Sequence, residues 1–126
     1  MDSIKATVND IVTDNNTALS VGSGSLAVYA TPAMLALIEK AACEALKGSI
    51  DEAETTVGTL LNVKHIAATP VGMKVSGTAE LIERDGRRLV FKVEANDECG
   101  MIGEGIHERF IVNSEKFTSK TYSKKQ

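Results

Sequence analysis

The chain has little of what metal centres, disulfide frameworks and membrane spans require. Its 126 residues include two cysteines and two histidines, with no CxxC or Cys/His ligand spacing. A dedicated zinc or iron site is therefore not expected. Cys43 and Cys99 lie far apart in the sequence. Both are predicted to be reduced thiols, with Cys43 packing in a helix as a small apolar residue.

Long apolar runs and an excess of charge of one sign are also missing. No apolar run approaches the roughly 20 residues that span a bilayer. The first residues, MDSIKATVND, contain neither the basic start nor the apolar block of a signal peptide, which predicts a cytoplasmic protein. The net charge is −3, from 14 basic and 17 acidic residues. Such a balance gives no field that would attract nucleic acid or an anionic membrane.

What the sequence does contain is typical of one globular domain. Hydrophobic residues make up 43% of the chain and charged residues 25%, which is the usual composition of folded proteins. A chain of this length can bury roughly two-thirds of its unfolded surface without metals or disulfides. We therefore predict a single domain over residues 1–126, in which the basic end, residues 118–126, is frayed.

The residue pattern predicts one long helix and five strands. Thr31 as N-cap and Pro32 as first helical residue open a helix that ends near Gly48. Its predicted apolar face consists of Leu35, Ile38, Ala42, Ala45 and Leu46. Strands are expected over 4–12, 55–67, 73–84, 87–96 and 101–117, with a loop over 14–25 and a hairpin turn at Asp85-Gly86.

These elements predict an α+β fold, with the helix on one face of a five-stranded antiparallel sheet. The last four strands are expected to form a meander. Long strands with exposed edges in a small domain favour pairing across a two-fold axis.

Several polar side chains stand where chemistry could be performed. Glu39 is at the border of the apolar stripe of the helix, where a carboxylate suits general-base work or orients water, although a long side chain can also reach solvent from there. Thr31 at the helix start could cap the helix, or its hydroxyl could act as a nucleophile or donor. His65 shares a strand face with Leu61 and Val63, so we expect it to be half-buried.

The packing of the strands decides which of these side chains meet and what the triplet His107, Glu108 and Arg109 does. If the strand of His65 lies under the helix near Glu39, then Thr31, Glu39 and His65 form a cluster with acid–base capacity near neutral pH. On the last strand His107 and Arg109 face one way and Glu108 the other. Two interpretations of this triplet are open. Its charged side chains pair with those of neighbouring strands, or Arg109 holds a phosphate or carboxylate of a ligand.

Four stretches of the chain, in the same order and spacing, also resemble a known family. They are VGSGSLAVYATPAMLALIEKAACEAL at 21–46, TTVGTLLNVKHIAATPVGMKV at 55–75, DGRRLVFKVEANDE at 85–98 and IGEGIHERFIV at 102–112. Together they resemble the fluoroacetyl-CoA thioesterase-like branch of the hot-dog superfamily, over residues 15 to 117. The resemblance implies a hot-dog fold and a homodimer with active sites at the subunit interface, which could pair further into a tetramer.

The resemblance also implies an activity. It is the hydrolysis of a small or medium acyl-CoA to free acid and CoA, with no cofactor because CoA is part of the substrate. The implied catalytic residues are Thr31, Glu39 and His65. The implied substrate-binding residues are Gly58 and Arg109.

The sequence departs from the family in the segment ahead of the helix. The fluoroacetyl-CoA enzyme carries lid phenylalanines there that help to select its acyl group, whereas residues 1–30 contain no Phe and Tyr29 is their only aromatic residue. Ile106 stands where the family has a polar Thr. We therefore expect an acyl preference other than fluoroacetyl. A non-catalytic acyl-CoA-binding module and a hot-dog dehydratase of 3-hydroxyacyl thioesters are the alternative interpretations.

Overall fold

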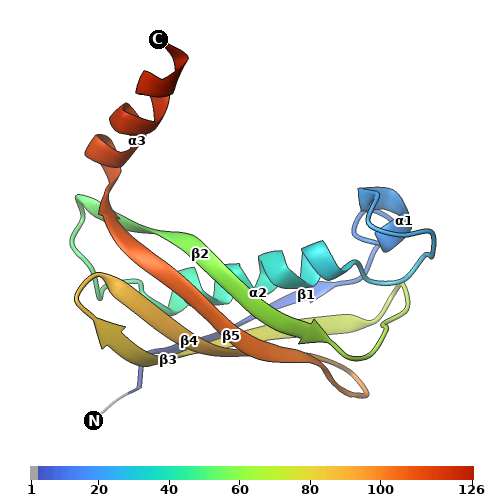
Figure 1. Ribbon diagram of the computed structural model, residues 1–126. Coiled ribbons are helices and arrows are strands. Elements are labelled where there is room, and N and C mark those ends of the chain that lie inside the picture. Colours follow the sequence, from blue (N-terminus) through green and yellow to red (C-terminus); the bar gives the residue numbers. More distant parts are fainter. Residues whose placement is uncertain (1–2) are drawn as a thin grey trace.

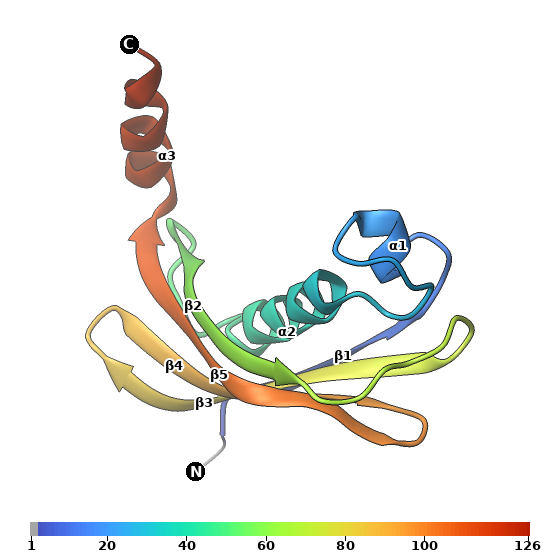
Figure 2. The ribbon, with the colours of Figure 1, turned by 45° about the vertical axis from the view of Figure 1, so that its right-hand side comes forward.

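The computed structural model describes residues 3–126 and contains a curved antiparallel sheet wrapped around one long helix (Figures 1 and 2). The helix is α2 (Thr31–Ala45). The strands are β1 (Lys5–Ile11), β2 (Glu54–His65), β3 (Lys74–Asp85), β4 (Arg88–Asp97) and β5 (Gly100–Asn113). The predicted α+β fold, with one helix on five antiparallel strands, is confirmed. Met1 and Asp2, which belong to the predicted domain 1–126, lie outside the described residues.

The strand order differs from the predicted four-strand meander. It is β1-β3-β4-β5-β2, so β3, β4 and β5 form a meander while β2 pairs with β5 and β1 pairs with β3. The connection between β2 and β3 explains this order, because it forms a bridge from Pro70 to Val28, ahead of α2, instead of turning back as a hairpin. As a result β1 and β2 are the two edges of the sheet.

The start of α2 also differs from the prediction. Ala30 is the N-cap, without a side-chain cap bond, and Thr31 is already helical. The preceding backbone is held by two bonds, from the Tyr29 N–H to the Thr69 carbonyl at 2.9 Å and from the Ala30 N–H to the Asn16 carbonyl at 2.9 Å. Because these bonds fix where the chain enters the helix, the Thr31 hydroxyl is not used as a cap and is available for another partner.

The buried face of α2 is rotated relative to the predicted one. Its buried residues are Met34, Leu37, Ile38, Ala41 and Ala42, whereas Leu35 and Ala45 are only partly buried. They pack on Phe91, Leu89, Ile102 and Ile111 of the sheet. The prediction that Cys43 packs in the helix is wrong, since this rotation leaves the Cys43 thiol exposed.

Two segments without a predicted helix are helical. Within the predicted loop 14–25, Thr17 caps the short helix α1 (Ala18–Val21), which ends at Gly22 in the left-handed conformation. The predicted last strand ends at Asn113, whose side chain accepts from the Lys116 N–H and caps α3 (Ser114–Tyr122).

The expected frayed end, residues 118–126, begins within this helix, and its fraying stays a prediction. The capped helix α3 is followed by the 3₁₀ turn η1 (Ser123–Lys125). Residues 115–126 are all exposed, and α3 points away from the sheet (Figures 1 and 2).

Candidate active site

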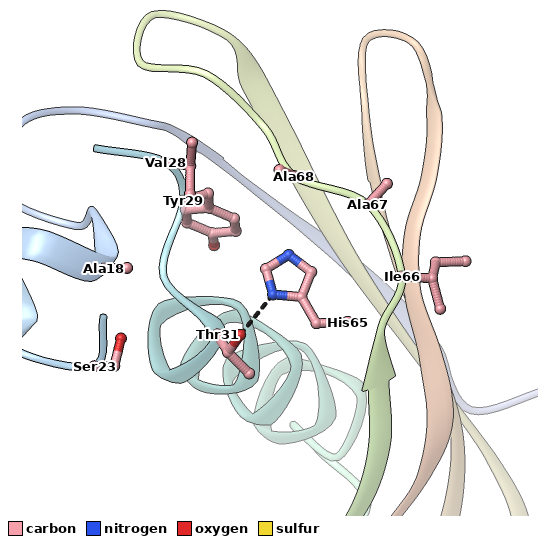
Figure 3. A pocket seen from close by; sticks show the side chains of 9 residues that line it. All are labelled: Ala18, Ser23, Val28, Tyr29, Thr31, His65, Ile66, Ala67 and Ala68. Atoms are coloured by element: carbon pink, nitrogen blue, oxygen red, sulfur yellow. Dashed lines mark hydrogen bonds between the residues drawn. The ribbon is translucent and has the colours of Figure 1, made fainter. Parts of the chain in front are cut away.

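Thr31 and His65 are in direct contact at one end of the molecule. The Thr31 Oγ1 lies 2.7 Å from His65 Nδ1, so the first residue of α2 meets the last residue of β2 (Figure 3). Both residues line a cavity of about 290 Å³. The other lining residues come from α1 and its flanks and from the connection after β2, and they are Ala18, Ser23, Val28, Tyr29, Ile66, Ala67 and Ala68.

The environment of His65 favours a neutral imidazole. Burial lowers its pKa from the ordinary value of 6.5, and the backbone of Ala67 opposes part of this shift. In the tautomer with the proton on Nε2, Nδ1 can accept the hydrogen of the Thr31 hydroxyl. The pair therefore has the arrangement of a hydroxyl nucleophile and its general base.

A second polar cluster surrounds Glu39, in the middle of α2. Its carboxylate Oε2 lies 3.2 Å from the Nη1 of Arg109, and the Arg109 side chain is 7% exposed against 38% for that of Glu39. Arg109 also donates from Nε to the Thr56 hydroxyl at 2.8 Å and from Nη2 to the Thr56 carbonyl at 3.0 Å. These bonds fix the guanidinium, which in turn fixes one side of the Glu39 carboxylate.

Gly58 makes room for this cluster. A Cβ atom at Gly58 would lie 2.5 Å from the Glu39 Oε2 and 3.3 Å from the Arg109 Nη1. The register of β2 against β5 shifts directly after Gly58, so that Thr59 is an extra residue in the pairing. Such bulges redirect side chains and end regular pairing beside functional sites. Gly58 is therefore needed for the close approach of the carboxylate to the strand.

His107 lies beside Arg109, on the same face of β5. Its side chain is buried, its Nδ1 lies 2.8 Å from the Leu60 carbonyl, and its Nε2 lies 3.2 Å from the Arg109 Nη1. Burial lowers the pKa of His107, and the Arg109 cation lowers it further. Glu108 faces the other way and bonds to Arg88 at 3.0 Å. The predicted division of this triplet between two faces is confirmed.

The two clusters are separate within one copy of the chain. Thr31 and Glu39 are eight residues apart in one helix, which corresponds to about 12 Å along its axis. The structure thus joins Thr31 to His65, and joins Glu39 to Gly58 and Arg109. It does not place Glu39 at the Thr31–His65 pair, as the predicted three-residue cluster required.

Sequence reasoning missed Thr56 and Tyr29. Thr56 is two residues before Gly58 on β2 and therefore shares its face, which is the signal that could have linked it to Arg109. Tyr29 is two residues before Thr31 and lines the same cavity. Only the structure shows that its side chain is buried.

Within residues 3–126 no group of three or more His, Cys, Asp or Glu side chains could hold a metal ion. In the same part of the chain, no helix has the length and apolar character needed to cross a membrane.

Comparison with known proteins decides the family. The family model described as fluoroacetyl-CoA-specific thioesterase matches residues 12–115. The chain belongs to this family. The fluoroacetyl-CoA thioesterase of Streptantibioticus cattleyicolor is 42% identical to this member of the family over 97 residues, which are 77% of this chain and 70% of that protein.

Solved structures of relatives show the same fold. A structure of the fluoroacetyl-CoA thioesterase matches with a TM-score of 0.89 at 35% identity, covering 95% of this chain and 93% of that chain. A Thermus thermophilus protein described as a thioesterase superfamily member matches with a TM-score of 0.90 at 28% identity, covering 99% and 93%. A hot-dog-like protein from Thermanaerovibrio acidaminovorans has a TM-score of 0.86 at 23% identity, covering 95% and 89%, and shows the fold alone.

The predicted family and hot-dog fold are thus confirmed. The prediction of an acyl-CoA thioesterase is confirmed at the level of the thioesterase family. The predicted roles of Thr31, Glu39, His65, Gly58 and Arg109 stay predictions.

Proposed function

We propose that this family member hydrolyses a small or medium acyl-CoA thioester to free acid and CoA at the cavity of Thr31 and His65. The observation that carries the proposal is the 2.7 Å contact between the Thr31 hydroxyl and His65 Nδ1 in the wall of that cavity. Family membership supports the same reaction. Coenzyme A enters as part of the substrate, and no further cofactor is invoked.

The reaction starts at the thioester carbonyl carbon. The Thr31 oxygen, or a water that it orients, forms a bond to this carbon while His65 Nδ1 accepts the proton. First-turn N–H groups of α2, which lack partners within the helix, stabilise the negative charge that develops on the carbonyl oxygen. The C–S bond then breaks, and the CoA thiolate takes a proton from His65 or water. Where Thr31 itself carries the acyl group, water hydrolyses that ester in a second step.

Glu39 and Gly58 complete the site across a subunit interface. β2 is an edge strand that carries Gly58 near its middle and His65 at its end. When the β2 edges of two copies pair antiparallel across a two-fold axis, the two strands run in opposite directions. The Glu39–Gly58 cluster of one copy then approaches the Thr31–His65 pair of the second copy. The exposed Leu60 and Leu61 on β2 support such an interface. In the completed site Glu39 orients water or acts as base.

Arg109 is assigned a different role from the predicted contact with the acyl end or the CoA. Its guanidinium is buried and already bonded to Thr56, Glu39 and His107. It therefore acts by positioning the Glu39 carboxylate. Gly58 acts by leaving space for that carboxylate beside the strand.

The first experiment measures free-thiol release from a panel of acyl-CoAs, from acetyl through medium-chain and aryl esters. We expect turnover of at least one ester and a loss of about 100-fold or more in Thr31→Ala and His65→Ala. Thr121→Ala, on exposed α3, is the matched control and should keep full activity. Absence of release from every ester would reject the proposal. Activity that survives in Thr31→Ala would reject the assignment of Thr31.

The second experiment tests the shared site. We expect Thr31→Ala and Glu39→Gln each to be inactive alone. The two proteins are then unfolded together and refolded as a mixture. Random pairing makes about half of the dimers mixed, and each mixed dimer has one intact site, so about a quarter of the wild-type activity should return. No recovery would show that one copy supplies the whole site.

We place the protein in the cytoplasm as a homodimer. Its two cysteines are free and exposed, which fits a reducing compartment. Size-exclusion chromatography with light scattering distinguishes the dimer from a monomer or a tetramer.

A further inference from the structure

Tyr29 has a hydroxyl group that the structure leaves without a partner. The side chain is 2% exposed, and among residues 3–126 its phenol oxygen makes no hydrogen bond. Burying a hydroxyl without a partner is costly, so native proteins do so rarely and for a reason. Tyr29 lines the cavity of Thr31 and His65, and Figure 3 shows its oxygen at the end of the ring that faces these two residues.

A second atom in this cavity is in the same situation. The Nε2 of His65 is buried and makes no well-formed hydrogen bond within the described part of the chain, although the backbone of Ala67 lies close enough to raise the pKa of the ring. When Nδ1 accepts from Thr31, the proton of the neutral ring is on Nε2, which is then a donor. Burial, aided by Asp10, raises the pKa of Tyr29 to about 12, so its phenol stays protonated and can donate as well. The cavity therefore offers two donors that require an acceptor.

The other side chains in the cavity wall are mostly small, and apart from Ser23 they are apolar. Ala18, Val28, Ala67 and Ala68 are among them. A short acyl chain fits such a space, whereas the phenol would remain unpaired against a purely alkyl chain. Sites that must pair a buried polar group discriminate against ligands that lack the matching atom.

We propose that Tyr29 is a specificity-determining residue that donates a hydrogen bond to an oxygen on the acyl group, next to the thioester carbonyl. The preferred substrates are then short 2-hydroxyacyl- or 2-oxoacyl-CoA thioesters. This inference rests on the proposed function, because it names the acyl group for the same site. The residue acts on the acyl substituent and not on the thioester carbonyl, which is common to every substrate.

The test compares two esters of equal size, glycolyl-CoA and propionyl-CoA, which differ by a hydroxyl in place of a methyl group. We expect wild type to prefer glycolyl-CoA in kcat/KM, and Tyr29→Phe to reduce this preference about tenfold by losing activity on glycolyl-CoA alone. Tyr122→Phe is the matched control, because Tyr122 is 63% exposed on α3. An unchanged preference, or an equal loss on both esters, would overturn the proposal.

Binding of analogues that cannot be hydrolysed separates this inference from the proposed function. In the dethia-CoA analogues of the two esters a methylene replaces the sulfur, and their Kd values are measured by calorimetry. Tyr29→Phe should reduce the preference for the glycolyl analogue about tenfold here too. If wild type hydrolyses no ester, the proposed function fails, and the Kd ratio still decides the role of Tyr29.

The melting temperature of the free protein checks the premise. Removing an unpaired buried hydroxyl leaves no orphaned partner, so Tyr29→Phe should melt no lower than wild type. A fall of several degrees would show that the phenol has a partner in the free protein, and would overturn the inference.

Discussion

Replacing Gly58 with alanine should remove activity while the fold survives. The added Cβ would lie 2.5 Å from the Glu39 Oε2, whereas a carbon and an oxygen in ordinary contact are about 3.3 Å apart or more. The carboxylate must therefore move by about 0.8 Å, which breaks its 3.2 Å contact with the Arg109 Nη1. Because the Glu39 side chain is 38% exposed, it can rotate into solvent.

The expected loss of stability is small. Loss of the contact with the partly exposed Glu39 costs about 1 kcal/mol, because the buried Arg109 guanidinium keeps its two bonds to Thr56. Gly58 does not have a positive φ, so alanine fits its backbone and gains about 0.4–1 kcal/mol from the unfolded state. The two terms nearly cancel, and the melting temperature should change by only a few degrees. A displacement of about 1 Å in a catalytic site can lower the rate about 100-fold.

The assay pairs kcat/KM on the best acyl-CoA with thermal melting, and Gly86→Ala is the contrasting variant. Gly86 has φ 62° and nothing within 4 Å of an added Cβ, so alanine there costs about 1–2 kcal/mol of backbone strain far from the site. Gly86→Ala should melt at a lower temperature and keep its activity. Gly58→Ala should melt within a few degrees of wild type and lose its activity. Full activity in Gly58→Ala would refute the role of the Glu39 position. Unfolding of that variant would show that the contact is structural.

Three further predictions follow from individual contacts. Thr31→Ala should lose activity but melt at the wild-type temperature, because the Thr31 hydroxyl does not cap the helix; a drop of several degrees, equivalent to about 1 kcal/mol, would indicate a cap. On acidification kcat/KM should fall with an apparent pKa below 6.5, since protonated His65 cannot accept the Thr31 proton; a value above 6.5 would contradict this base. Because folding lowers the pKa of His107, this histidine takes up a proton at a higher pH in the unfolded chain than in the folded chain. Urea denaturation should therefore give a lower free energy of unfolding as the pH falls below about 6.5, and a smaller dependence in His107→Gln.

Local patterns were enough to predict most of the elements. The presence of the helix α2, the hairpin at Asp85 and Gly86 and the alternation along β4 depend on residues that are neighbours in the chain. The same alternation placed His107 and Arg109 on one face of β5. These properties follow from backbone geometry, which has a fixed period, so the sequence by itself determined them.

The pairing of distant segments was decided only by the tertiary structure. The strand order, the rotation of α2 that exposes Cys43, and the contact of Glu39 with Arg109, 70 positions later, each depend on the packing of the whole core. Periodicity says which face of a strand is apolar but not which strand lies beside it. The meeting of Thr31 and His65, 34 positions apart, is decided in the same way, because the segment before α2 is bonded to the segment after β2, from the Tyr29 N–H to the Thr69 carbonyl.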